Sequence, residues 1–223
     1  AGIAHELNTP LANITLKADY ISAIVCNEKT PPNIDILHKE ISEIKDQVKF
    51  CAQIVKDLLQ FSRKMDLNVK RFELSSLLTD LIELPAISAK IKERNIEFIF
   101  EKEKDVILDA DRVLLFQVFQ NLITNSIDAL EYVKHKPRIK IGYSIINGSI
   151  EIKVMDNGTG IKESDLLRVF EPFFTTKQVG KGTGLGLSIC RGIIEKHGGT
   201  ISIKSTFGKG TEVIVALPIR NPT

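Results

Sequence analysis

Apolar residues in the first 65 positions recur at alternating steps of four and three. The first run is Leu7, Leu11, Ile14, Ala18, Ile21 and Val25, and the second is Ile34, Leu37, Ile41, Ile44, Val48, Cys51, Val55 and Leu58. Such steps place side chains on one narrow stripe of a helix, as in a coiled-coil seam. Because Lys29-Thr30-Pro31-Pro32 interrupts the pattern, we predict two helices that form an antiparallel hairpin.

A lone hairpin cannot enclose its own seam. A second copy would complete a four-helix bundle, so we expect a homodimer through the helical hairpin. The alternative is a hairpin that packs its stripe on the second domain of its own chain. The helical pattern is already running at Ala1 without a capping residue. This start suggests a fragment whose upstream portion, such as a sensor or membrane segment, is missing.

From about residue 72 the periodicity is mixed. Strand patterns occupy residues 95–100, 138–146, 149–155, 200–205 and 211–217, and helical patterns occupy residues 112–130 and 187–197. Asn147-Gly148 between two strand patterns is a strong hairpin signal. We therefore predict a second domain of the α+β class, an α/β sandwich with a mixed sheet and helices on one face.

Composition narrows the function only slightly. The 223 residues are 43% hydrophobic and carry a net charge of +2 without a dense Lys/Arg tract, so nucleic acid is not an expected partner. No apolar stretch reaches the ~18 residues that span a bilayer, so membrane attachment would come only through missing upstream segments. Cys26, Cys51 and Cys190 form no CxxC pair, and we interpret them as reduced packing residues of a cytoplasmic protein.

Two glycine-containing segments carry candidate binding chemistry. Asp156-Asn157-Gly158-Thr159-Gly160 follows a strand, where glycines permit close backbone approach and the aspartate offers acceptors to an amino group. An ordinary turn is the alternative. Glycines at 180, 182, 184 and 186 lead into a helix, whose free N–H groups and dipole suit a phosphate. Neither the Walker A spacing nor the dinucleotide GxGxxG spacing is present.

Polar residues on two predicted helices add to these segments. Asn121 and Asn125 share one helix face, and a side-chain amide oxygen is a suitable ligand for Mg²⁺. A solvated helix face is the alternative. In His5-Glu6-Leu7-Asn8-Thr9-Pro10, a neutral imidazole is a competent nucleophile and the adjacent carboxylate can accept its proton. A lone surface histidine is the ordinary alternative, and Thr9 excludes an HExxH zinc site.

Taken together, these motifs resemble those of the sensor histidine kinases. HELNTP at 5–10 looks like the H box, NLITNSIDAL at 121–130 the N box, and DNGTGI at 156–161 the first glycine box. EPFFTTK at 171–177 looks like the F box, GTGLGLSI at 182–189 the second glycine box, and GKGT at 208–211 a further glycine element. The resemblance implies a dimerisation and histidine phosphotransfer domain over residues 1–67 and a catalytic ATP-binding domain of the Bergerat type over residues 68–223.

The resemblance also implies roles for individual residues. His5 would be the phospho-acceptor, Glu6 its acid–base partner, and Thr9 the residue that orients a water for dephosphorylating the partner. Asn125 would bind Mg²⁺, with Asn121 beside it. Asp156 would accept the adenine amino group of ATP, and Gly158, Gly160 and Thr211 would shape that end of the site. The phosphates would be lined by Lys177, Gly182, Gly184 and Gly186.

The implied activity is ATP-dependent autophosphorylation on His5. The phosphoryl group would then pass to an aspartate of a response regulator receiver domain, with phosphatase activity on that regulator as an additional function. The linker near residues 64–72 would be a hinge and residues 171–186 a mobile lid.

Two other classes remain as alternatives. Gyrase-like and chaperone-like ATPases resemble the second domain, but they usually carry a glutamate where Asn121 stands, and an amide cannot take a proton from water. A pseudokinase scaffold would only dimerise and bind, and the intact His5, Asn125 and Asp156 argue against it.

Overall fold

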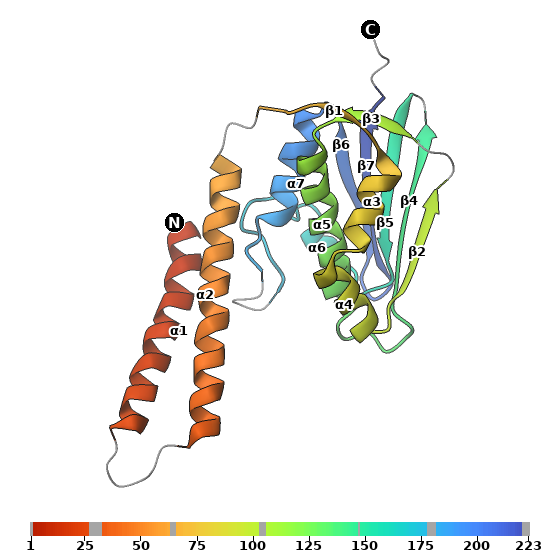
Figure 1. The fold of residues 1–223 in the computed structure, drawn as a ribbon. Coiled ribbons are helices and arrows are strands. Elements are labelled where there is room, and N and C mark those ends of the chain that lie inside the picture. The colour runs from red at the N-terminus through yellow and green to blue at the C-terminus, as the bar shows by residue number, and fades with distance from the viewer. Residues whose placement is uncertain are drawn as a thin grey trace. The chain divides into compact units, whose positions relative to one another are not determined.

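The computed structural model describes residues 2–26, 33–62, 66–102, 106–146, 148–177 and 182–219, without the side chains of residues 2–6, 60–62 and 102. The chain divides into two compact units (Figure 1). The first unit comprises Ala1–Arg63 and Glu171–Leu185, and the second comprises Lys64–Phe170 and Gly186–Thr223. Among the described residues, no helix is both long enough and apolar enough to cross a membrane.

The first unit contains the predicted antiparallel hairpin, formed by α1 (Gly2–Val25) and α2 (Ile34–Ser62). The predicted interruption at residues 29–32 lies outside the described residues. Asn33 caps α2, because its Oδ1 accepts from the backbone N–H groups of Asp35 and Ile36. Between the helices, Lys17 of α1 pairs with Glu40 of α2 at 2.7 Å and also with Glu43.

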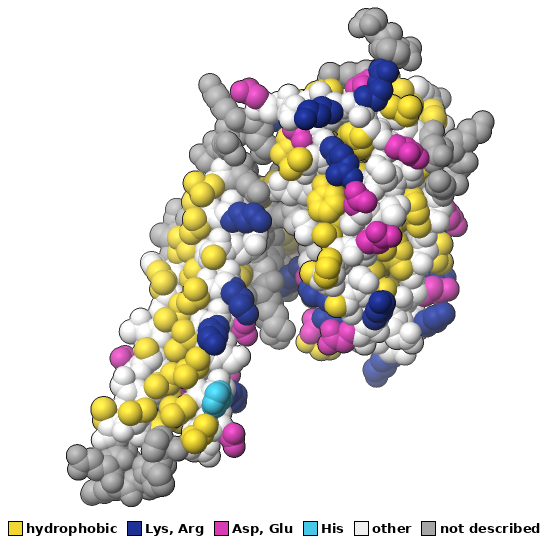
Figure 2. Space-filling view, in the orientation of Figure 1, with side chains coloured by type: hydrophobic (Ala, Val, Ile, Leu, Met, Phe, Trp, Pro, Cys, Tyr) yellow, Lys and Arg dark blue, Asp and Glu magenta, His cyan; other side chains and the backbone are white. Residues whose placement is uncertain are grey.

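The apolar stripe of each helix consists of two rows with different exposure. One row is half-buried and contains Leu7, Ile14, Ile21, Leu37, Ile44, Cys51 and Leu58. The other, here called the exposed row, contains Leu11, Ala18, Val25, Ile34, Ile41, Val48 and Val55. Members of each row on one helix are seven residues apart, so each row follows one heptad position. Apolar side chains run along the hairpin surface in Figure 2.

The second unit is built on a five-stranded sheet in the order β2-β4-β5-β7-β6. Its strands are β2 (Glu97–Lys102), β4 (Arg138–Ile146), β5 (Ser149–Asp156), β6 (Thr200–Thr206) and β7 (Gly210–Pro218). β2 pairs in parallel with β4, and the other pairs are antiparallel, so the sheet is mixed. A separate antiparallel ladder joins β1 (Lys70–Glu73) to β3 (Ile107–Ala110).

In the described part of the chain, helices cover one face of this sheet, as Figure 1 shows. They are α3 (Leu74–Ile82), α4 (Pro85–Glu93), α5 (Arg112–Ala129), the short α6 (Glu163–Leu166) and α7 (Gly186–Lys196). Along β4 and β5 burial alternates, with Ile139, Ile141, Ile150 and Ile152 fully buried and their neighbours partly exposed. This period-two burial is what one covered face requires. The predicted fold class, a helical hairpin followed by a mixed α/β domain, is confirmed.

Several short elements are absent from the sequence prediction. α3 and α4 have nine residues each, and β1 and β3 have four each. A nine-residue helix has fewer than three turns, and a four-residue strand has only two repeats of its period. Periodicity alone therefore does not reveal these elements. The interpretation of all three cysteines as packing residues is wrong for Cys26, which is exposed, whereas Cys190 is buried.

A hydrogen-bond network around Asp111 joins the start of the second unit to α5. The Asp111 carboxylate caps α5 by accepting from the backbone N–H groups of Val113 and Leu114, and it accepts from the N–H of Asn68 at 2.9 Å. The backbone N–H of Asp111 donates to Nε2 of the buried His197 at 3.0 Å. Because that nitrogen accepts, the His197 proton lies on Nδ1, which donates to the carbonyl of Ile193 at 2.8 Å.

This network corrects the expected hinge at residues 64–72. Asn68 is bonded to Asp111, and from Lys70 onward the backbone is paired with β3. Rotation within residues 68–72 would break these bonds, so this part of the predicted hinge belongs to the folded second unit.

Removing the cap should destabilise the second unit. We expect Asp111→Ala to lower the free energy of unfolding by about 1–2 kcal/mol, because it removes an N-cap and leaves three N–H groups without their acceptor. The matched control is Asp80→Ala, which removes a nearby carboxylate from its exposed ion pair with Arg112. Denaturant unfolding should show a clearly smaller loss for the control. Equal losses in the two variants would contradict the role of the cap.

Candidate functional site

The Asp156 side chain stands at the end of β5 and is the most strongly constrained carboxylate of the candidate site. Its Oδ1 accepts from the backbone N–H of Gly158 at 2.9 Å, and its Oδ2 accepts from the Ser126 hydroxyl at 3.1 Å. The backbone N–H of Thr211 supplies a further hydrogen bond. Burial raises the pKa of Asp156, although these three hydrogen bonds oppose the rise. A carboxylate has about four acceptor positions, so capacity remains for an external donor.

Gly158 lies where the loop after β5 meets the end of α5. The backbone N–H of Thr159 donates to the carbonyl of Ala129 at 3.0 Å. A Cβ at position 158 would lie 2.7 Å from that carbonyl oxygen and 2.8 Å from Oδ1 of Asp156. Only glycine therefore fits this approach without displacing the Asp156 carboxylate.

The same loop is tied to the turn between β6 and β7. Gly160 has a φ of +65°, and a Cβ there would lie 2.2 Å from the carbonyl oxygen of Thr206. Gly208 donates its N–H to the carbonyl of Thr159 at 2.7 Å. Thr211 follows this turn and faces Asp156 across the β5–β7 pairing. The structure thus brings together Asp156, Gly158, Gly160 and Thr211, as the sequence predicts.

The asparagine pair lies on a half-buried face of α5. Asn121 and Asn125 are both partly exposed, while Leu122 and Ile123 between them are fully buried. The Asn121 amide donates to the carbonyl of Gly186, the first residue of α7, at 3.4 Å. A hydrogen bond from Asn121 also reaches Cys190, but burial dominates there and raises the pKa of that thiol to about 12. The alternative interpretation, a solvated helix face, is therefore wrong for Asn121, which contacts the start of α7.

The remaining predicted phosphate-site residues, Lys177, Gly182 and Gly184, lie in the first unit. Phe173 adopts a φ of +67°, and its N–H donates to the carbonyl of Gly184 at 3.0 Å. A Cβ at Gly182 would lie 3.0 Å from Cδ of Lys177, so this side chain runs beside the glycine. The structure thus places Gly182 beside Lys177, Gly184 beside Phe173 and Gly186 beside Asn121.

Three polar residues of these regions are missing from the sequence prediction. Ser126 is buried and donates to Asp156, and Ser205 lies opposite Thr211 on β6. In the first unit, the buried Asp57 of α2 accepts from the Thr183 hydroxyl at 2.7 Å and from the Gln53 amide at 2.6 Å. Serine next to Asn125 was an available signal for Ser126, whereas the contacts of Asp57 depend on tertiary structure.

The H-box residues lie on α1, which continues through Pro10. Thr9 is half-buried and Pro10 is buried. The side chains of His5 and Glu6 lie outside the described part of the structure. Among the described residues, no group of three or more His, Cys, Asp or Glu side chains could hold a metal ion.

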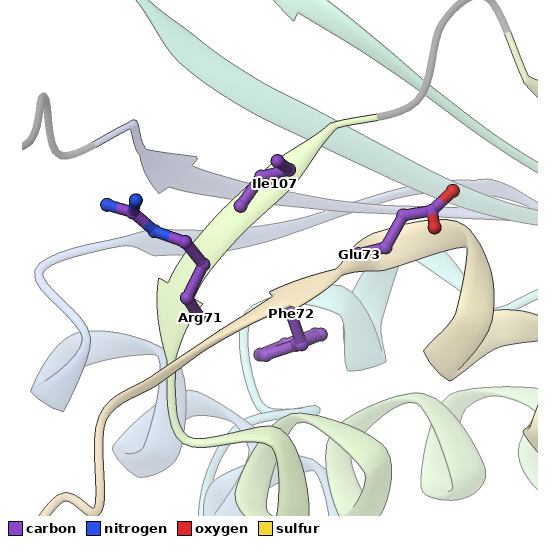
Figure 3. Close-up of a pocket in the computed structure, with 4 residues that line it drawn as sticks. All are labelled: Arg71, Phe72, Glu73 and Ile107. Atoms are coloured by element: carbon purple, nitrogen blue, oxygen red, sulfur yellow. The ribbon is translucent and has the colours of Figure 1, made fainter.

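A surface pocket elsewhere in the second unit contains none of the predicted site residues. It lies on the β1–β3 ladder and is lined by Arg71, Phe72, Glu73 and Ile107 (Figure 3). Arg71 is paired with Asp109 of the same ladder at 3.1 Å, and Ile107 is 60% exposed. These features describe an open surface rather than a buried binding site.

Both parts of the chain are similar to known protein families. Residues 110–221 match the family described as Histidine kinase-, DNA gyrase B-, and HSP90-like ATPase, and residues 1–66 match the His Kinase A (phospho-acceptor) domain. Sensor kinase CckA of Brucella abortus (strain 2308) is 34% identical over 97% of this chain and 23% of its own length. Sensor histidine kinase ZraS of Escherichia coli O157:H7 is 31% identical over 98% of this chain and 45% of its own length.

A solved structure agrees with these relatives. Histidine kinase ThkA in complex with response regulator protein TrrA aligns over 98% of this chain and 60% of the ThkA chain, with 31% identity and a TM-score of 0.77. The chain spans less than half the length of CckA or ZraS. It belongs to the histidine kinase-, DNA gyrase B- and HSP90-like ATPases and, with its phospho-acceptor domain, to the two-component sensor histidine kinases.

The close approach at Gly158 generates a prediction. We expect Gly158→Ala to weaken ATP binding by at least about tenfold, because the new methyl group must displace the Asp156 carboxylate or the end of α5. Gly192→Ala is the matched control, since a Cβ there meets nothing within 4 Å and alanine favours the helix. Titration calorimetry with ATP should find the control unchanged. Unaltered binding in Gly158→Ala would contradict the cradle described for Asp156.

Proposed function

We propose that this chain is the catalytic portion of a sensor histidine kinase that binds the adenine base of ATP in its second unit and phosphorylates His5. The single observation that carries the proposal is the half-buried Asp156 carboxylate, held by Gly158, Ser126 and Thr211, in a chain whose residues 1–66 match a phospho-acceptor domain. We place the functional boundary between a phosphotransfer domain over residues 1–67 and a catalytic domain over residues 68–223.

In this proposal Asp156 accepts a hydrogen bond from the exocyclic amine of adenine. The carboxylate is the group with remaining acceptor capacity, and Gly158 and Gly160 allow the loop after it to pack against the end of α5 and the β6–β7 turn. Thr211 lies beside it on β7. Lys177 and the N–H groups of Gly182, Gly184 and Gly186 are proposed to contact the triphosphate, because cations and helix N-termini bind phosphate.

We propose Mg²⁺ as the accompanying metal ion, with the amide oxygen of Asn125 as its protein ligand and Asn121 beside it. The donor set fits this ion, since Mg²⁺ binds substrate phosphates and water and needs few protein ligands. When bound, it would neutralise charge on the phosphates. Asn121 itself holds the start of α7 through Gly186.

The transfer step needs a nucleophile and a proton acceptor on α1. A nitrogen of the neutral His5 ring attacks the γ-phosphorus, the bond from phosphorus to the ADP oxygen breaks, and Glu6 accepts the proton from the ring. Because Asn121 cannot take a proton from water, the site favours transfer over hydrolysis. The phosphohistidine would then donate its phosphoryl group to an aspartate on a second protein.

The proposed partner is a response regulator receiver domain. Support comes from ThkA, which was crystallised with the response regulator protein TrrA. Three free cysteines fit a reducing compartment, and we place this kinase portion in the cytoplasm.

The exposed row of the hairpin supports a homodimer. A row of apolar side chains at heptad spacing, left in solvent on both helices, is the surface that a second hairpin would cover in a four-helix bundle. Several of its members are more than 40% exposed, among them Leu11, Val25 and Val48. Burying such side chains contributes about 1.5–3 kcal/mol each, so the row has ample apolar surface to drive association.

His5→Gln should abolish autophosphorylation and leave ATP affinity unchanged, because His5 belongs to the phosphotransfer domain. Incubation with γ-labelled ATP should label the unmodified protein at an acid-labile, base-stable position, with little free phosphate released.

Label of this kind on His5→Gln would exclude His5 as the acceptor. Rapid phosphate release without label would favour a hydrolysing ATPase, and no turnover at all would favour a scaffold.

Thr9→Ala is the contrasting variant on the same helix. A hydroxyl can both donate to and accept from a water, so we propose that Thr9 orients the water that dephosphorylates the partner. We expect this variant to keep the autophosphorylation rate and lose phosphatase activity toward the phosphorylated regulator. A parallel change in both rates would contradict the separate role of Thr9.

Charge in the exposed row should dissociate the dimer. We expect Ile41→Lys combined with Val48→Lys to give a monomer in light scattering while ATP binding persists, because two cations per chain would be buried in the bundle. Leu16→Lys is the matched control, since Leu16 is 69% exposed but lies outside the row. A monomeric unmodified chain, or a dimer that survives the double substitution, would exclude the row as the interface.

A further inference from the structure

The Ser205 hydroxyl is a polar group of the second unit that the proposed function does not use. Ser205 lies on β6, directly opposite Thr211 on β7. Its oxygen accepts from the backbone N–H of Ile161 at 2.9 Å and donates to the carbonyl of Gly210 at 2.7 Å. It also lies 3.0 Å from Oγ1 of Thr211. Three contacts fill the hydrogen-bonding capacity of one hydroxyl.

The single proton of the Ser205 hydroxyl fixes the direction of the hydrogen bond between Ser205 and Thr211. A serine hydroxyl has one proton and two lone pairs. The carbonyl of the buried Gly210 can only accept, so it receives the Ser205 proton in the shortest of the three contacts. The N–H of Ile161 takes one lone pair, and the hydroxyl of Thr211 must therefore donate to the other.

Thr211 consequently uses its only proton on Ser205. Its oxygen retains lone pairs, so toward any ligand this hydroxyl can act only as an acceptor. Thr211 is also paired with Asp156, and its backbone N–H donates to that carboxylate. The wall at this end of the site therefore presents two side-chain acceptors, a carboxylate and a hydroxyl whose direction is fixed.

The two acceptors would meet different groups on the two kinds of purine. Adenine carries an amine at position 6, which donates. Hypoxanthine and guanine carry a carbonyl oxygen at the same position, which would face acceptors without a donor. A donor or acceptor without a partner in a buried site loses its hydration and gains nothing in return.

We propose that Ser205 is a positioning residue for base selection, which holds the Thr211 hydroxyl as an acceptor and so favours a 6-amino purine over a 6-oxo purine. The inference rests on the proposed binding of the base at Asp156. It assigns to Ser205 a role that acts through Thr211 rather than through contact with the nucleotide.

A purely structural role predicts a different result. If Ser205 only holds the turn between β6 and β7, its removal should weaken all nucleotides equally. If it orients Thr211, its removal frees that hydroxyl to rotate and donate to a 6-oxo group. ATP should then bind less tightly while inosine triphosphate is affected less or gains.

The test compares ATP with inosine triphosphate by titration calorimetry on the whole chain. The inosine base carries a carbonyl oxygen in place of the amine at position 6 and a proton on the adjacent ring nitrogen. We expect Ser205→Ala to reduce the preference for ATP by about three- to tenfold, the effect of one hydrogen bond. Ser205→Thr should restore the preference because it keeps the hydroxyl. In a Thr211→Val background, Ser205→Ala should leave the preference unchanged, since the two residues then no longer interact.

The outcomes separate this inference from the proposed function. An unchanged preference in Ser205→Ala, with ATP still bound, would overturn the role of Ser205 and leave ATP binding intact. A change that persists in the Thr211→Val background would overturn it as well, because Ser205 would then act by another route. If the unmodified chain binds neither nucleotide, the proposed function and this inference both fail. Should Ser205→Ala fail to fold, Thr211→Val alone must still lower the preference for ATP.

Discussion

The Asp156 carboxylate is the group on which the organisation of the second unit depends. Withdrawing a carboxylate even partly from water is costly unless it is paired or hydrogen-bonded. Here the donors come from α5, the loop after β5, and β7. Those donors can converge only if the end of α5 approaches the loop closely and the β6–β7 turn packs beneath it. The glycines at 158 and 160 are the positions where this approach leaves no room for a side chain. The need to supply hydrogen-bond donors to Asp156 therefore determines both the binding chemistry and the local fold.

Much of the fold follows from patterns in the sequence. The helical hairpin, α5, α7 and all five strands of the main sheet lie within about two residues of their predicted positions, because each has several repeats of its period or a clear turn signal. The β1–β3 ladder and the two nine-residue helices do not, since tertiary packing rather than periodicity stabilises such short elements. The expected hinge was too long because a hydrogen bond between Asn68 and Asp111, 43 residues apart, leaves no trace in local sequence.

The candidate site shows the same division. The resemblance to the sensor histidine kinases implies the grouping of Asp156, Gly158, Gly160 and Thr211. The residues themselves indicate only an acceptor at Asp156 and a close backbone approach at the two glycines. The partners that determine how those residues act were missing from the prediction. Ser126 supplies a proton to Asp156, and Ser205 receives one from Thr211. A serine in a helix or on a strand is unremarkable in sequence, and only the geometry of its neighbours gives its hydroxyl a direction.

The anchoring of the linker at Asp111 has a mechanical consequence. Tension that arrives along the chain from α2 is carried first by the hydrogen bond from Asn68 to the Asp111 carboxylate. The same carboxylate caps the helix that carries Asn121 and Asn125, and the backbone of Asp111 is bonded to His197 at the end of α7. The load is thus shared between the N-terminus of α5 and the C-terminus of α7. These two helices are in contact through Asn121 and Gly186. A force on the linker would be felt as torque between α5 and α7 before it strained the sheet.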